Sequence, residues 1–191
     1  MVFDEGGFSW LNKPAHRFSD NSLEITTHPE TNLWQGTHSG FRRDNAHIYV
    51  KKVREDFLVR TNCFIKNTKN FDQGGLTVRL DKENWITLAL AAGPSGKEIW
   101  GIVTNNGYSD WSRTLITNIF TQICLRVQGK GSDFLLEYSL DKTDWNKIRI
   151  AHLHTYRGEA LVGVFACSPK EGASTKVDFN EFEIGQRIWV D

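Results

Sequence analysis

The chain has 191 residues, 39% hydrophobic and 24% charged, which is enough to bury one sizeable core. The chain has 23 Lys and Arg residues and 23 Asp and Glu residues, so its formal net charge is zero. A neutral chain without a basic block argues against nucleic acid and anionic membranes as partners. The N-terminus has neither a basic start nor an apolar stretch, and no segment is long and apolar enough to span a membrane. We therefore expect a cytoplasmic protein.

Apolar and polar residues alternate from Ser22 to Thr26, a period of two that predicts a half-buried strand. Further β-rich runs, most of them bounded by turn residues, follow at 56–65, 75–80, 85–91, 99–104, 123–128, 133–139, 161–167 and 177–184. No stretch has a helical stripe with both caps, and 114–122 could hold one helical turn at most. About a dozen strands joined by tight turns predict an all-β, two-sheet antiparallel sandwich formed by residues 1–191 as one domain.

Three cysteines, Cys63, Cys124 and Cys167, each lie inside an apolar strand-like run without metal-type spacing. This pattern predicts buried free thiols in a reducing compartment. One disulfide with a spare thiol is the alternative.

A polar and aromatic cluster occupies residues 31–47, where His38, Asp44 and His47 accompany Trp34. Donors and acceptors beside a ring suit a hydroxyl-rich ligand. The alternative is a long connection whose polar side chains satisfy its own backbone.

The second cluster consists of Asp72 and Gln73 before a strand, Arg79 within it and Trp85 at the start of the next strand. Thr77 and Arg79 share one strand face, and a hairpin would bring Arg79 beside Trp85. This pair could hold a ligand, or it could form a structural cation–π contact.

A third cluster follows the Asn106-Gly107 hairpin signal. Asp110 could accept hydrogen bonds from ligand hydroxyls while Trp111 stacks on the ligand. The alternative for Trp111 is a place in the core.

Other patterns carry less chemistry. His152 and His154 share a strand face but lack a third ligand, so we predict no metal. Glu181 and Glu183 could form a carboxylate pair, although a solvated strand face is the simpler interpretation. The sequence contains no Gly-rich phosphate loop, His-Glu-x-x-His helix or Gly-x-Ser-x-Gly elbow, and we predict no cofactor.

Several segments occur together in an order typical of one family: 10–14, 41–47, 72–79, 84–86, 109–112 and 138–141. Over about Trp10 to Ile184 the chain resembles the domain-of-unknown-function family labelled "regulation of enolase protein", in the concanavalin A-like lectin/glucanase superfamily. The resemblance implies a concanavalin A-like jelly roll and a soluble cytoplasmic protein that regulates central carbon metabolism. Sugar binding is implied only by analogy of fold.

The chain departs from the family pattern at Ala46, where a glycine is usual. Thr87, Ala89 and Ala91 stand where a lysine, a glycine and a glutamate are expected. The three alternating acidic positions of glucanases are also absent, which argues against shared hydrolytic chemistry.

We therefore predict a non-catalytic binding or regulatory module whose ligand is a small carbohydrate or sugar phosphate. Its predicted ligand-binding residues are His38, Asp44, His47, Asp72, Gln73, Arg79, Trp85, Asp110 and Trp111. One alternative is a glycoside-active enzyme with Asp44 or Asp110 as acid or base and a histidine as helper. Another is a surface that binds a protein partner in glycolysis.

Overall fold

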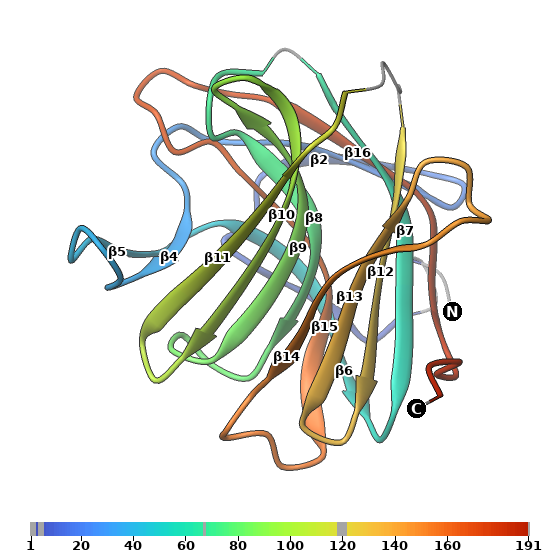
Figure 1. Ribbon diagram of the computed structural model, residues 1–191. Helices are drawn as coiled ribbons and strands as arrows, with labels where there is room; N and C mark the ends of the chain where they lie inside the picture. The colour runs from blue at the N-terminus through green and yellow to red at the C-terminus, as the bar shows by residue number, and fades with distance from the viewer. Residues whose placement is uncertain (1–2, 4–5, 67, 118–121, 191) are drawn as a thin grey trace.

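The computed structural model describes residues 3, 6–66, 68–117 and 122–190, and every regular element among them is a β-strand. Most strands lie in two seven-stranded antiparallel sheets (Figure 1). The first sheet has the spatial order β1 (Phe8–Leu11), β6 (His47–Arg54), β15 (Glu159–Cys167), β8 (Gln73–Arg79), β9 (Trp85–Gly93), β10 (Gly96–Asn105) and β11 (Tyr108–Leu115). The second has the order β14 (Asn146–His152), β13 (Asp133–Ser139), β12 (Ile123–Lys130), β7 (Phe57–Lys66), β16 (Lys176–Gly185), β3 (Ser22–Thr26) and β2 (Ala15–Ser19).

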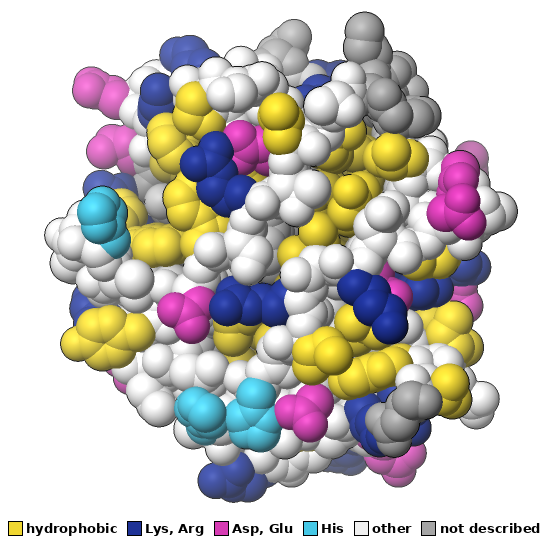
Figure 2. Space-filling model, viewed as in Figure 1, with side chains coloured by type: hydrophobic (Ala, Val, Ile, Leu, Met, Phe, Trp, Pro, Cys, Tyr) yellow, Lys and Arg dark blue, Asp and Glu magenta, His cyan; other side chains and the backbone are white. Residues whose placement is uncertain are grey.

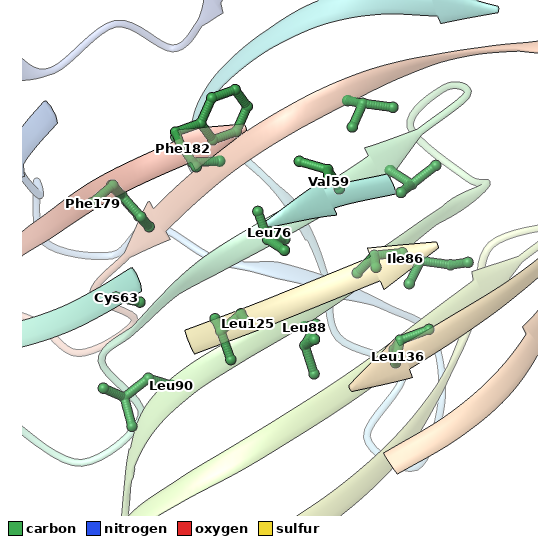
Figure 3. Close-up of a cluster of buried hydrophobic side chains, with 14 of the residues drawn as sticks. Val59, Cys63, Leu76, Ile86, Leu88, Leu90, Leu125, Leu136, Phe179 and Phe182 are labelled. Atoms are coloured by element: carbon green, nitrogen blue, oxygen red, sulfur yellow. The ribbon is translucent and has the colours of Figure 1, made fainter. Parts of the chain in front are cut away.

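The main core lies between the two sheets, where alternate side chains of facing strands meet (Figure 3). Ile86, Leu88 and Leu90 point inward from β9, while Val59 and Cys63 do so from β7. Each of these side chains is at most 1% exposed. The alternation seen in the sequence therefore selects the inner face of each strand.

A second, smaller core covers part of the outer face of the first sheet. There Trp85, Ala89 and Ile102 pack with Leu33 from β4 (Leu33–Gln35). This strand pairs with β5 (Arg42–Asp44) in a separate hairpin that extends beside β11 (Figure 1). Because both faces of β9 are covered, all of its residues are buried.

The predicted two-sheet antiparallel sandwich is confirmed, and each predicted run falls on an observed strand. Short strands such as β1, β4 and β5 were not predicted, since three or four residues carry little periodicity. Of the segment 114–122, residues 114 and 115 belong to β11, and 118–121 lie outside the described residues.

The three cysteines are free and buried, so the free-thiol prediction is confirmed and the disulfide alternative is wrong. No helix that could cross a bilayer occurs in the described part of the chain.

Candidate functional site

A cleft of about 460 Å³ opens on the outer face of the first sheet, between the β4–β5 connection and strands β10 and β11. Its walls are largely aromatic and apolar, formed by Trp34, Phe41, Phe71, Trp100, Ile102 and Trp111. Figure 2 shows hydrophobic side chains gathered at the upper left of this view, above the position of the β4–β5 hairpin in Figure 1. The volume falls within the range typical of small-molecule sites.

Strand register explains why the indoles meet. Trp111 pairs with Ile102, and Arg113 pairs with Trp100, so all four side chains share the outer face of the β10–β11 hairpin. The Trp100 and Trp111 rings lie 4.7 Å apart at 77°. Trp34 meets Trp111 at 6.2 Å and 78°. Edge-to-face contacts hold the rings in place, and Trp111 remains 38% exposed at the cleft.

A buried carboxylate fixes this aromatic wall. Glu98 is 2% exposed and accepts a hydrogen bond of 2.6 Å from Trp100 Nε1. Arg113 donates to both of its oxygens, at 2.8 and 2.6 Å, and lies 4.9 Å from the Trp111 ring centroid. The hydrogen bond from Arg113 lowers the pKa of Glu98, which keeps the carboxylate ionised. At Gly93 a Cβ would stand 2.2 Å from the Glu98 carboxylate, so glycine leaves room for it.

Polar residues complete the cleft at its edges. Gln73 is 3% exposed and lines the cleft, whereas His38 is exposed at the rim with a left-handed φ of 69°. Asp110 borders the same space, but strand alternation directs its side chain to the face opposite Trp111. Of the nine predicted residues, the structure thus brings His38, Gln73, Asp110 and Trp111 to one cleft.

Asp44 and Arg79 lie elsewhere and hold each other. Arg79 donates two hydrogen bonds to the Asp44 carboxylate, at 2.6 and 2.7 Å. The Arg79 side chain is 9% exposed and that of Asp44 is 25% exposed. Asp44 lines a different, polar pocket with residues such as Arg42 and Lys82. The pair therefore ties the hairpin to the sheet, since β5 carries Asp44 and β8 carries Arg79.

His47 is fully buried and bonded at both ring nitrogens. Its Nε2 accepts from the His28 backbone N–H at 2.9 Å, so Nδ1 carries the proton that is donated to the Asn12 carbonyl at 2.6 Å. Burial lowers the pKa of His47, which favours the neutral ring. We expected His47 at the rim of the ligand site. The structure instead buries its ring, which connects the backbone of His28 to that of Asn12 through hydrogen bonds.

Asp72 and Trp85 are also inaccessible, each 0% exposed. The Lys69 N–H donates to one Asp72 oxygen at 2.7 Å, and burial raises the pKa of this carboxyl group. Trp85 packs in the second core beneath the hairpin, so it does not reach the cleft as a ligand-binding residue.

Sequence reasoning missed Trp100, Glu98 and Arg113. A signal was present, because Glu98, Trp100 and Ile102 alternate along one face of β10, and Arg113 follows Trp111 by two positions. Sequence could not show that these alternating residues face a cleft. Within the described residues, no three His, Cys, Asp or Glu side chains converge on a metal-binding geometry.

The two seven-stranded antiparallel sheets define a concanavalin A-like β-sandwich, which carries an aromatic cleft on its outer face. The chain belongs to the family described as "Protein of unknown function (DUF1349)", whose model matches residues 10–187. It is 29% identical over 177 residues to "Regulation of enolase protein 1" of Saccharomyces cerevisiae, covering 92% of this chain and 88% of that protein.

Solved structures show the same fold. A functionally unknown protein from Saccharomyces cerevisiae superposes with a TM-score of 0.91 at 26% identity, covering 99% of this chain and 100% of that one. The carbohydrate binding module CBM66 from Bacillus subtilis gives 0.61 at 13% identity, over 96% of this chain and 98% of that one. The GH43 protein BlXynB from Bacillus licheniformis gives 0.77 at 14% identity, over 97% of this chain and 38% of that one.

Proposed function

We propose that the chain is a single-domain, cytoplasmic, non-catalytic module that reversibly binds a small polyhydroxylated ligand in the outer-face cleft and thereby regulates carbohydrate metabolism. The observation that carries this proposal is the wall formed by Trp34, Trp100 and Trp111 around a cleft of about 460 Å³.

The chemistry of the cleft suits a sugar ring. A sugar presents apolar C–H faces, which pack on indole faces, and hydroxyl groups at its edge, which need hydrogen-bond partners. Trp111 offers a partly exposed ring, while Gln73 and His38 lie where hydroxyl groups would need donors and acceptors. The volume suits one or two sugar rings.

The relatives support the same class of function. The name of the yeast relative points to regulation in carbon metabolism, and that of the Bacillus subtilis module points to carbohydrate binding. Asp44, one of the two acids considered for catalysis, is held by Arg79 away from the cleft. Asp110 is then the one acidic residue that lines the cleft among the described residues, so no carboxylate pair lines it, which supports recognition over hydrolysis.

The test is calorimetric titration of the purified protein with neutral mono- and disaccharides and with sugar phosphates. Trp111→Ala should weaken binding of any ligand found by about 30-fold, because an aromatic anchor contributes about 2 kcal/mol. Ile150→Ala is the matched control, since Ile150 is 64% exposed on β14 of the other sheet. This variant should bind the ligand as tightly as the wild-type protein does.

Three results would overturn the proposal. The first is that no sugar or sugar phosphate binds at millimolar concentration, and the second is that Trp111→Ala leaves the binding of a ligand intact. The third concerns the non-catalytic part of the proposal: turnover of chromogenic glycosides above the buffer rate would contradict it.

A further inference from the structure

A second cavity, of about 280 Å³, lies on the outer face of the second sheet, away from the aromatic cleft. Cys124 on β12 pairs with Asn62 on β7 and with Ser139 on β13, so the three side chains form one row across the sheet. Lys142, in the loop after β13, completes one side of the cavity. The row lies outside the main core, whose members on these strands include Cys63 and Leu125.

Asn62 is the unusual member of this row. It is 1% exposed, and its amide nitrogen makes no hydrogen bond. Leaving a buried amide donor without an acceptor is costly, so such groups are rare in folded proteins and call for an explanation. The cavity beside Asn62 offers a place for the missing acceptor.

The other polar groups of the loop are already satisfied. Ser139 Oγ donates to Asp141 at 3.0 Å and accepts the Lys142 N–H at 2.8 Å. The Thr143 and Asp144 N–H groups both donate to Asp141 at 2.8 Å. These backbone bonds hold the pKa of Asp141 well below its usual range. The loop is therefore organised before any ligand binds.

Glu181, on β16, lies beside the cavity, where it contacts Lys142. A β-bulge between Asn180 and Glu183 interrupts the pairing with β7, and Glu181 takes a left-handed φ of 52°. Its carboxylate oxygens each lie 2.7 Å from Lys142 Nζ. Lys142 lowers the pKa of Glu181, and Asn62 adds to this effect without forming a hydrogen bond of normal geometry. The Glu181 carboxylate thus already binds the ammonium group of Lys142 and interacts with the Asn62 amide.

We propose that this cavity binds a small monocarboxylate, and that the side chain of Glu181 competes with it for Lys142. The ligand carboxylate would accept from Asn62 and Lys142, and its body would fill the space beside Cys124 and Gln122. The ligand carries a single carboxylate, because Asp141, which lines the cavity, and Glu181, which contacts Lys142, would repel a second negative charge.

The experiment follows the Asn62 side-chain amide by two-dimensional ¹⁵N NMR while sodium acetate or sodium lactate is added. Sodium chloride at equal ionic strength is the reference. The wild-type protein should show a saturable shift of the Asn62 amide. Glu181→Gln removes the competing charge with little change of shape, so acetate should bind about fivefold more tightly.

The matched variants are Lys142→Gln and Lys147→Gln, which make the same charge change at two exposed positions. Lys142→Gln should abolish the shift, and Lys147→Gln, on β14 and outside the cavity, should preserve it. Either of two results would overturn the proposal. In Glu181→Gln, acetate could shift the Asn62 amide no more than chloride does, or Lys142→Gln and Lys147→Gln could change the acetate shift equally. Either result is independent of binding at the aromatic cleft.

Discussion

Arg79 shows that strand alternation predicts the sheet face on which a side chain lies, but not whether that face is exposed. The sequence placed Arg79 beside Trp85 across a hairpin, and the register of β8 and β9 confirms this pairing. Both side chains are nevertheless covered, because the segment that carries Leu33 and Asp44 folds over that face of the sheet. Arg79 consequently pairs with Asp44, a partner 35 positions away in sequence.

Asp44→Asn tests whether this ion pair is structural. The substitution leaves the Arg79 charge at 9% exposure without its counter-charge, so the free energy of unfolding should fall by about 2 to 4 kcal/mol. Urea unfolding measures the change, and calorimetry should find ligand affinity in the aromatic cleft unaltered. Glu159→Gln, in an exposed ion pair with Lys52, is the control and should change the free energy of unfolding much less. Normal stability together with lost ligand binding would instead assign Asp44 to the ligand.

At the scale of elements, the β4–β5 hairpin decides where the cleft lies. The Gln35 N–H donates to Ser109 Oγ at 2.9 Å, and Arg42 donates to the Gly107 carbonyl at 2.7 Å. These bonds attach the hairpin to the start of β11 and place Trp34 opposite Trp111. The loop-rich cluster of the sequence is therefore divided: His38 reaches the cleft, and Asp44 and His47 brace the sheet.

The first sheet also requires close strand contact at Gly75, on β8. A Cβ there would stand 2.0 Å from the Leu88 carbonyl oxygen of β9, which is backbone and cannot move aside cheaply. Gly75→Ala should therefore lower the free energy of unfolding by more than about 3 kcal/mol. Chemical denaturation measures this loss. Gly185→Ala, whose Cβ would meet only the flexible Glu183 side chain at 3.3 Å, serves as the control, and equal midpoints for the two variants would contradict the steric argument.

Across the whole molecule, all three thiols are buried, Cys63 between the two sheets, Cys167 in the second core and Cys124 beside the second cavity. Cys63 and Cys167 are 0% exposed and Cys124 is 7% exposed, and burial raises the pKa of each thiol. A buried, protonated thiol is a poor nucleophile. The protection belongs to the packed sandwich, since each cysteine lies on a different strand.

The native protein should consequently react slowly with a disulfide reagent such as dithionitrobenzoate, and three thiols should react after denaturation. Asp44→Asn should react faster than the wild-type protein, because it unfolds more often. Absorbance of the released thiolate measures the rates. Rapid reaction of one thiol in the native wild-type protein would show that local opening exposes it.

A period of two and turn residues are local properties, and they predicted most of the longer strands, the all-β class and the pairing of Arg79 with Trp85. Strands without so clear a pattern, among them β1, β4, β5 and β6, were not predicted. The sequence also placed Trp111 and Asp110 after the right turn. Which face of a strand is open depends on segments distant in sequence, so it follows from the packing of the folded chain and not from local patterns. Thus Trp85 became core beneath the hairpin, and Trp100, held by Glu98, became a wall of the cleft.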